Sequence, residues 1–140
     1  MPRISFFFFA TGGLFVMAGV SLGIWMGMHE NFTLAPVHAH INLIGWASMG
    51  LMGAFYAVAG ERAPRKLGWV TYGLLTLGLF IMVPTLAKLL MGDKTVTPIL
   101  GVSEMMVALG MLIFFVSVLM TWSRSRSNAS AGLTAAMPAE

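Results

Sequence analysis

The sequence Pro36-Val37-His38-Ala39-His40-Ile41-Asn42 places two of the chain's three histidines at the start of an apolar run that continues to Ala59. On an α-helix, residues two apart differ in direction by about 200° and in height by about 3 Å. The imidazoles of His38 and His40 therefore point to nearly opposite sides of one helix. A single helix can thus offer one imidazole to each of two different neighbours.

The composition indicates an integral membrane protein whose surroundings are the lipid bilayer. Of 140 residues, 58% are hydrophobic and only 9% are charged, which is too little polar material to cover a soluble domain of this size. The chain has no cysteine, which excludes structural disulfides, thiolate metal sites and iron–sulfur clusters. The net charge of +3 lies in loops and tails, where it orients a membrane protein, and we expect no nucleic-acid partner.

Four apolar segments organise the chain, each long enough to cross a hydrocarbon core of about 30 Å. Their connections are short, so consecutive helices should be antiparallel neighbours. We therefore predict an all-α fold, a four-helix transmembrane bundle over residues 1–122, followed by a flexible cytoplasmic tail at residues 123–140. The first segment is longer than the apolar core of about 7–15 residues in a secretory signal, and we expect it to be retained. The predicted spans are residues 4–27, 37–59, 67–91 and 96–122.

The cationic residues predict the orientation of the bundle. If the chain crosses the membrane four times, six of them fall on one side, which the positive-inside rule makes cytoplasmic. We expect a bacterial-type inner membrane, both termini in the cytoplasm, and His38 and His40 near the outer face. The six residues are Arg3, Arg62, Arg65, Lys66, Arg124 and Arg126.

Glycine spacing predicts where the first span meets another helix. Gly19, Gly23 and Gly27 recur every four residues, a spacing of small residues that lets membrane helices approach closely. We expect this face of the first span to be a helix–helix contact.

The second span carries two stripes of residues at helical spacing. The first, which we call the His38 stripe, begins with a potential ligand and continues with a hydrogen-bonding amide, a gap at a glycine and methionine side chains, which makes it a candidate cofactor cleft. The second, the His40 stripe, is apolar and small enough to admit a flat hydrophobic ligand. Glycine and methionine are also common in ordinary transmembrane packing. The His38 stripe comprises His38, Asn42, Gly45, Met49, Met52 and Tyr56, and the His40 stripe comprises His40, Ile44, Ala47, Leu51 and Ala54.

Three further titratable residues are candidates for a site near the outer face, because a titratable side chain in a span calls for a partner or a function. Glu104 could orient an imidazole or relay a proton, or it could be a protonated carboxyl bonded to a neighbouring helix. Lys88 could meet an acidic group such as a cofactor propionate, although snorkelling to the interface is the commoner role of such a lysine. His29 could be a third metal ligand or an exposed loop residue.

The segment from Pro36 to Trp46 resembles the haem-binding helices of haem-copper oxidase subunit I and of the related NnrS membrane haem proteins. In that superfamily one helix carries an H-x-H pair whose imidazoles serve two haems on opposite faces, and another has a proline two residues before its haem histidine. His38 with His40 is similar to the first pattern, and Pro36 with His38 to the second. The resemblance implies haem b, bound through His38 and His40. Covalent attachment is excluded because the chain has no C-x-x-C-H motif.

The resemblance also implies an assembly. The oxidase subunit consists of three four-helix units, whereas this chain supplies one and has no counterpart of the oxidase's copper-binding histidine cluster. We therefore expect a homo-oligomer, a trimer resembling the twelve-helix oxidase core, without independent oxygen reductase activity. In this trimer His38 of one chain and His40 of the next would grip one haem iron.

Three functions follow from these residues. The first is a b-type cytochrome that exchanges electrons with a respiratory-chain donor or acceptor, or that binds or senses a gas if one axial position opens. The second is a membrane module that handles copper or zinc through His29, His38, His40 and Glu104. The third is a structural accessory subunit of a respiratory complex, in which the histidines only form hydrogen bonds.

Overall fold

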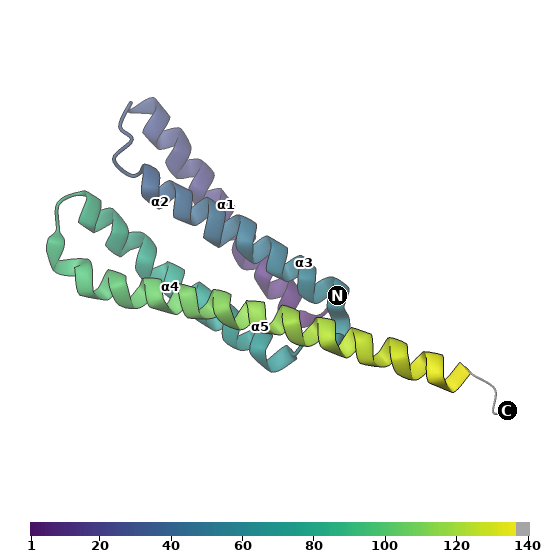
Figure 1. The fold of residues 1–140 in the computed structure, drawn as a ribbon. Coiled ribbons are helices and arrows are strands. Elements are labelled where there is room, and N and C mark those ends of the chain that lie inside the picture. The colour runs from purple at the N-terminus through teal and green to yellow at the C-terminus, as the bar shows by residue number, and fades with distance from the viewer. Residues whose placement is uncertain (137–140) are drawn as a thin grey trace.

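The computed structural model describes residues 1–136, with side chains to residue 127, and this part of the chain is all-helical (Figure 1). The second span is a composite helix, which we call the second-span rod. It consists of α2 (Ala35–His40), the π-helix η1 (Ile41–Ser48) and α3 (Met49–Ala59). The other long helices are α1 (Arg3–Met28), α4 (Arg65–Leu90) and α5 (Thr97–Ala136), and the short 3-10 helices η2 (Gly60–Arg62) and η3 (Lys94–Val96) precede α4 and α5.

Four helices in the described chain are long and apolar enough to cross a membrane. This confirms the prediction of an all-α chain with four such helices. The predicted spans 4–27, 37–59 and 67–91 differ from α1, the rod and α4 by two residues or fewer at each end. The candidate spans run over Arg3–Met28, Ala35–Arg62, Arg65–Leu90 and Lys94–Ser127.

The last helix differs from the expectation. We predicted a flexible tail from residue 123, but the structure continues α5 as helix to Ala136. Between Pro98 and Pro138 the sequence has no proline to interrupt the helix. The hydroxyls of Ser123 and Ser125 also donate to carbonyl oxygens one turn back, at 3.0 Å in both cases. The remainder of the predicted tail, residues 137–140, lies outside the described residues.

Glycine and an acidic cap set the connections between helices. Gly60 and Gly92 have positive φ angles of 57° and 102°, which end the rod and the α4 segment because glycine adopts this region without a steric penalty. The carboxylate of Asp93 then accepts hydrogen bonds from the hydroxyl (2.6 Å) and the backbone N–H (3.0 Å) of Thr95. These bonds hold the pKa of Asp93 below its usual value.

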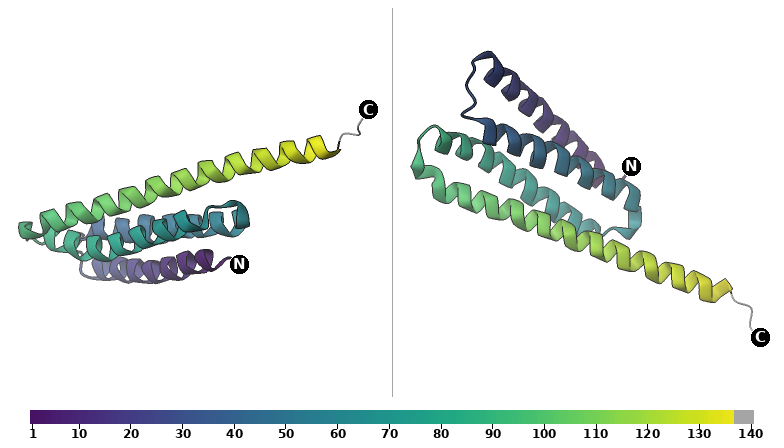
Figure 2. Two further views of the ribbon diagram at one scale, coloured as in Figure 1. Left: turned by 90° about the horizontal axis from the view of Figure 1, so that it is seen from below. Right: turned by 45° about the horizontal axis from the view of Figure 1, so that its top comes forward.

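The fold consists of two helical hairpins, α1 with the rod and α4 with α5 (Figures 1 and 2). Aromatic rings join them. Phe8 of α1 meets Tyr72 of α4 edge-on, with 5.3 Å between ring centroids, and Phe55 of the rod meets Phe114 of α5 edge-on at 5.2 Å. A hydrogen bond of 2.8 Å between the hydroxyls of Thr11 and Tyr72 adds a polar link between α1 and α4.

Both hairpin connections lie at one end of the bundle, and the N-terminus and the α3–α4 connection lie at the other (Figure 1). Arg62 and Arg124, two of the six cationic residues that are predicted to share one side of the membrane, meet at the second end. Arg124 of α5 donates to the carbonyl oxygen of Arg62 there, at 3.1 Å. The structure therefore has the arrangement that four crossings require, and the side of the membrane on which this end lies stays a prediction.

The two stripes of the second-span rod have different surroundings. Members of the His38 stripe pack into the core, where Met49 is 0% exposed and Tyr56 is 1% exposed. The His40 stripe lies on the open side, where Leu51 is 72% exposed. The π-helix η1 interrupts the regular α-helical spacing on which both stripes were drawn, but it does not move them off these faces.

Candidate functional site

His38 lies in the contact between α1 and α2. Its Nδ1 is 2.9 Å from the carbonyl oxygen of Gly19. Its ring occupies the space that Gly23 leaves, since a Cβ at that position would be 2.9 Å from Cε1 of His38. The predicted helix contact is thus present at Gly19 and Gly23. Gly27 takes no part in it within the chain, because no heavy atom lies within 4 Å of its missing Cβ.

Asn42 completes this contact one turn later. Its side-chain amide donates to the carbonyl oxygen of His38 at 2.9 Å and lies 3.4 Å from Nε2 of the same residue. Asn42 fits only because Gly19 has no side chain, since a Cβ there would be 2.5 Å from the Asn42 amide nitrogen. The glycines of α1 therefore shape a slot for the imidazole of His38 and the amide of Asn42.

His40 lies outside this contact. Its Nδ1 is 2.7 Å from the carbonyl oxygen of Pro36, one turn earlier on the same helix. The half-buried ring borders a small surface hollow of about 130 Å³ on the rod, lined also by Ala39, Leu43 and Ile44. His40 thus faces the open side of the rod, whereas His38 faces α1.

The two histidines share one feature that bears on metal binding. A carbonyl oxygen can only accept a hydrogen bond, so Nδ1 of each ring carries the proton and donates it. The Nε2 atom of each ring is then the one with the lone pair. A histidine that donates its other ring N–H to a backbone carbonyl is the usual form of a metal-ligating histidine, because the hydrogen bond fixes both tautomer and orientation.

The two imidazoles are suitable ligands for a haem iron, but the hollow beside His40 in one chain is too small to hold a haem. Small-molecule pockets are commonly about 300–1,000 Å³, and the hollow beside His40 is well below that range. The single chain therefore supplies imidazole ligands without an enclosing cavity. Among the described residues no three histidine, aspartate or glutamate side chains come together as a metal cluster.

The other predicted site residues lie apart from the two histidines. The space that Gly45 leaves is filled by Phe15 of α1, because a Cβ there would be 2.6 Å from the phenylalanine Cγ. His29 bonds to the carbonyl oxygen of Trp25 at 2.9 Å and stacks on its ring. Lys88 is exposed on α4.

Glu104 is exposed on α5. Residues seven apart on a helix differ in direction by only about 20°, so Glu104 lies on the same side of α5 as Met111 and Val118. Val118 faces the rod across a groove that Leu51 also lines. Glu104 itself does not line that groove, and in the described chain no hydrogen bond or ion pair joins it to either histidine.

Sequence reasoning identified the two histidines but not their backbone acceptors. The carbonyl oxygens of Gly19 and Pro36 carry no signal in the sequence beyond the glycine spacing of α1 and the four-residue offset from His40. The π-helix that follows His40 was also missed, because its residues Ile41–Ser48 have no pattern that distinguishes them from an α-helix. Such segments are frequent at functional sites.

Comparisons of the chain with protein-family models, with curated proteins and with solved structures give no match.

Proposed function

We propose that this protein is an integral membrane b-type haem protein that transfers electrons. Haem would be held non-covalently between copies of the chain, by His38 of one copy and His40 of the next. The observation that carries this proposal is that Nδ1 of each ring lies within hydrogen-bond distance of a backbone carbonyl oxygen, which leaves Nε2 as the ligand atom. At His38 the Asn42 amide, 3.4 Å from Nε2, would give up that contact when iron binds.

The placement of the two rings supports sharing between copies. His38 lies on the α1 side of the rod and His40 on its open side, so the two imidazoles of one chain do not converge on one point, and a second copy would be needed to bring both kinds of ligand to one iron. Contacts between two different faces are heterologous, and they close into a ring when the rotation allows it. A trimeric ring is also what the resemblance to the oxidase implies, and it would supply the enclosing surface that one chain lacks.

The roles of the chain's own residues follow from their contacts. The carbonyl oxygens of Gly19 and Pro36 hold the imidazoles in one tautomer and orientation. Asn42 fills the space beside His38 and keeps its ring against α1. The exposed side chain of Leu43, which lines the hollow beside His40, would exclude water from the interface between copies. Haem, when bound, would supply the one-electron redox couple.

The orientation and location of the protein in this proposal are inferred from its cationic residues. The positive-inside rule favours the cationic end in the cytoplasm of a bacterial-type inner membrane, which places both histidines in the outer half. Electrons would then be exchanged with a respiratory-chain partner at that side.

The proposal is tested by optical spectra of the detergent-purified protein, oxidised and dithionite-reduced, after expression with added haem precursor. We expect sharp six-coordinate bands in the wild type and their loss in His38→Ala and in His40→Ala. His29→Ala is the matched control, because His29 also bonds through Nδ1 to a carbonyl oxygen but only within its own helix end, and its spectrum should equal that of the wild type. A colourless wild type, or haem unaffected by both substitutions, would contradict the proposal.

A further inference from the structure

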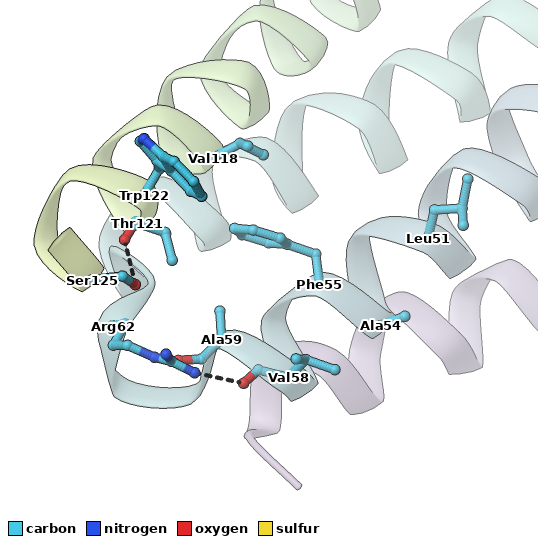
Figure 3. A pocket seen from close by; sticks show the side chains of 10 residues that line it. All are labelled: Leu51, Ala54, Phe55, Val58, Ala59, Arg62, Val118, Thr121, Trp122 and Ser125. Atoms are coloured by element: carbon cyan, nitrogen blue, oxygen red, sulfur yellow. Dashed lines mark hydrogen bonds between the residues drawn. The ribbon is translucent and has the colours of Figure 1, made fainter. Parts of the chain in front are cut away.

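A second site lies at the opposite end of the bundle from the histidines, in an open groove between α3 and α5 (Figure 3). The groove has a volume of about 480 Å³, within the range of about 300–1,000 Å³ that is typical of small-molecule sites. Its walls are apolar along most of their length, with the side chains of Leu51, Phe55 and Val58 on one side and those of Val118 and Trp122 on the other.

The groove has the length and direction of one lipid chain. It extends along the rod from Leu51 to Ala59, eight residues or about 12 Å along the helix axis, and continues past the end of the rod to Arg62. Half of a hydrocarbon core is about 15 Å. The groove thus runs parallel to the helices across one leaflet, from the middle of the bilayer to the interface.

The interfacial end of the groove is cationic. Arg62 lines the groove and also a second hollow of about 470 Å³, to which Glu61 and Arg124 contribute. The guanidinium of Arg62 reaches back to the carbonyl oxygens of Ala59 (3.4 Å) and Val58 (3.5 Å), and Arg124 donates to the carbonyl oxygen of Arg62 at 3.1 Å.

These backbone bonds position two arginines at one mouth and use only some of the five N–H donors that each guanidinium carries. The two positive charges exceed the single negative charge of Glu61. A planar guanidinium recognises phosphate by paired hydrogen bonds, and basic pockets between transmembrane helices at the cytoplasmic side bind anionic lipid head groups.

We propose that this groove binds an anionic phospholipid, with one acyl chain between α3 and α5 and the head-group phosphate at Arg62 and Arg124. The combination of an apolar channel as long as one leaflet with two arginines at its interfacial end distinguishes the site from the remaining lipid-facing surface. The proposal does not depend on the function of the two histidines.

The test is lipid retention by the detergent-purified full chain, measured by native mass spectrometry during titration with phosphatidylglycerol or phosphatidylcholine of identical chains. We expect the wild type to retain phosphatidylglycerol preferentially, and Arg62→Gln or Arg124→Gln to weaken that retention about fivefold each. Lys66→Gln is the matched control, because it removes a positive charge at the same end of the bundle from a residue that lines neither hollow, and it should retain the preference.

A second pair of variants tests the channel itself. Ala54→Phe fills the groove that Ala54 lines and should reduce retention of phosphatidylglycerol, whereas Ala18→Phe makes the same change on the exposed surface of α1 and should not. Equal retention of the two lipids by the wild type would overturn the proposal. The proposal would also be overturned if the wild type retained a neutral quinone that Ala54→Phe loses and Arg62→Gln keeps.

Discussion

The His38 stripe and the His40 stripe belong to the same helix, yet the fold treats them in opposite ways. The first is packed against α1 and the core, where Met49 and Tyr56 have almost no exposed surface, and the second is open, with Leu51 72% exposed. Each stripe begins with a histidine whose Nδ1 is held by a carbonyl oxygen. The difference shows that the ring of His38 is packed against α1, whereas the ring of His40, although held by its own helix, borders the open side of the rod.

The largest expected effect compares the two stripes directly. Met49→Ala should destabilise the protein by about 2 kcal/mol or more, because it leaves a cavity in a fully buried position. Leu51→Ala, two residues later on the open stripe, should stay within about 0.5 kcal/mol of the wild type, as substitutions at exposed positions usually do. Thermal unfolding of both variants in the same detergent measures the difference. Equal losses of stability in the two variants would contradict the difference in burial between the two stripes.

The next effect concerns overpacking of the buried stripe. Gly45→Ala should destabilise by about 1–3 kcal/mol, because its Cβ would come 2.8 Å from Cβ of Phe15, close to the α1 backbone. Gly50→Ala makes the same change on the same rod where no heavy atom lies within 4 Å, and it should leave stability unchanged or raise it, since alanine favours helix. An unfolding temperature for Gly45→Ala equal to that of Gly50→Ala would contradict the contact between α1 and η1.

The smallest expected effect acts on the imidazole of His38. Gly23→Ala should cost about 1 kcal/mol, because the new methyl group displaces the ring and lengthens its bond to the carbonyl oxygen of Gly19. Gly27→Ala, one turn later on α1, has open space around it and serves as the control. Unfolding temperatures and, in the haem-loaded protein, the position of the reduced bands should change in the first variant alone. Equal shifts of the unfolding temperature in Gly23→Ala and Gly27→Ala would contradict the contact between His38 and Gly23.

The fold was largely predictable from the sequence because spanning helices are limited by simple physical requirements. Apolar length gave the spans to within two residues for α1, the rod and α4, and the spacing of Gly19 and Gly23 gave the helix contact that they form. Helical periodicity also gave the two stripes of the second span, but not which of them is buried. The end of α5 was not predictable in this way, because serines that favour an irregular tail can also bond back to the helix, as Ser125 does to Thr121.

The candidate site was predictable only as a set of residues. The H-x-H spacing gave the opposite directions of His38 and His40, but which face would be covered depended on α1 and therefore on tertiary contacts. Gly45 was expected to leave room for a cofactor, and Phe15, thirty residues earlier in the sequence, occupies that room. Glu104 was placed at the depth of the histidines from span position alone, and the structure leaves it exposed and unconnected to them.

The central claim is that the two histidines of one haem come from different copies of the chain, and a complementation measurement tests it most directly. His38→Ala and His40→Ala chains with different affinity tags are co-expressed, assemblies that carry both tags are isolated, and their reduced spectrum is recorded. The account predicts that each variant alone lacks six-coordinate haem and that the mixed assembly regains it, because one interface again has an intact His38 and an intact His40. Mixed assemblies that stay without haem, or chains that load haem as monomers, would contradict it.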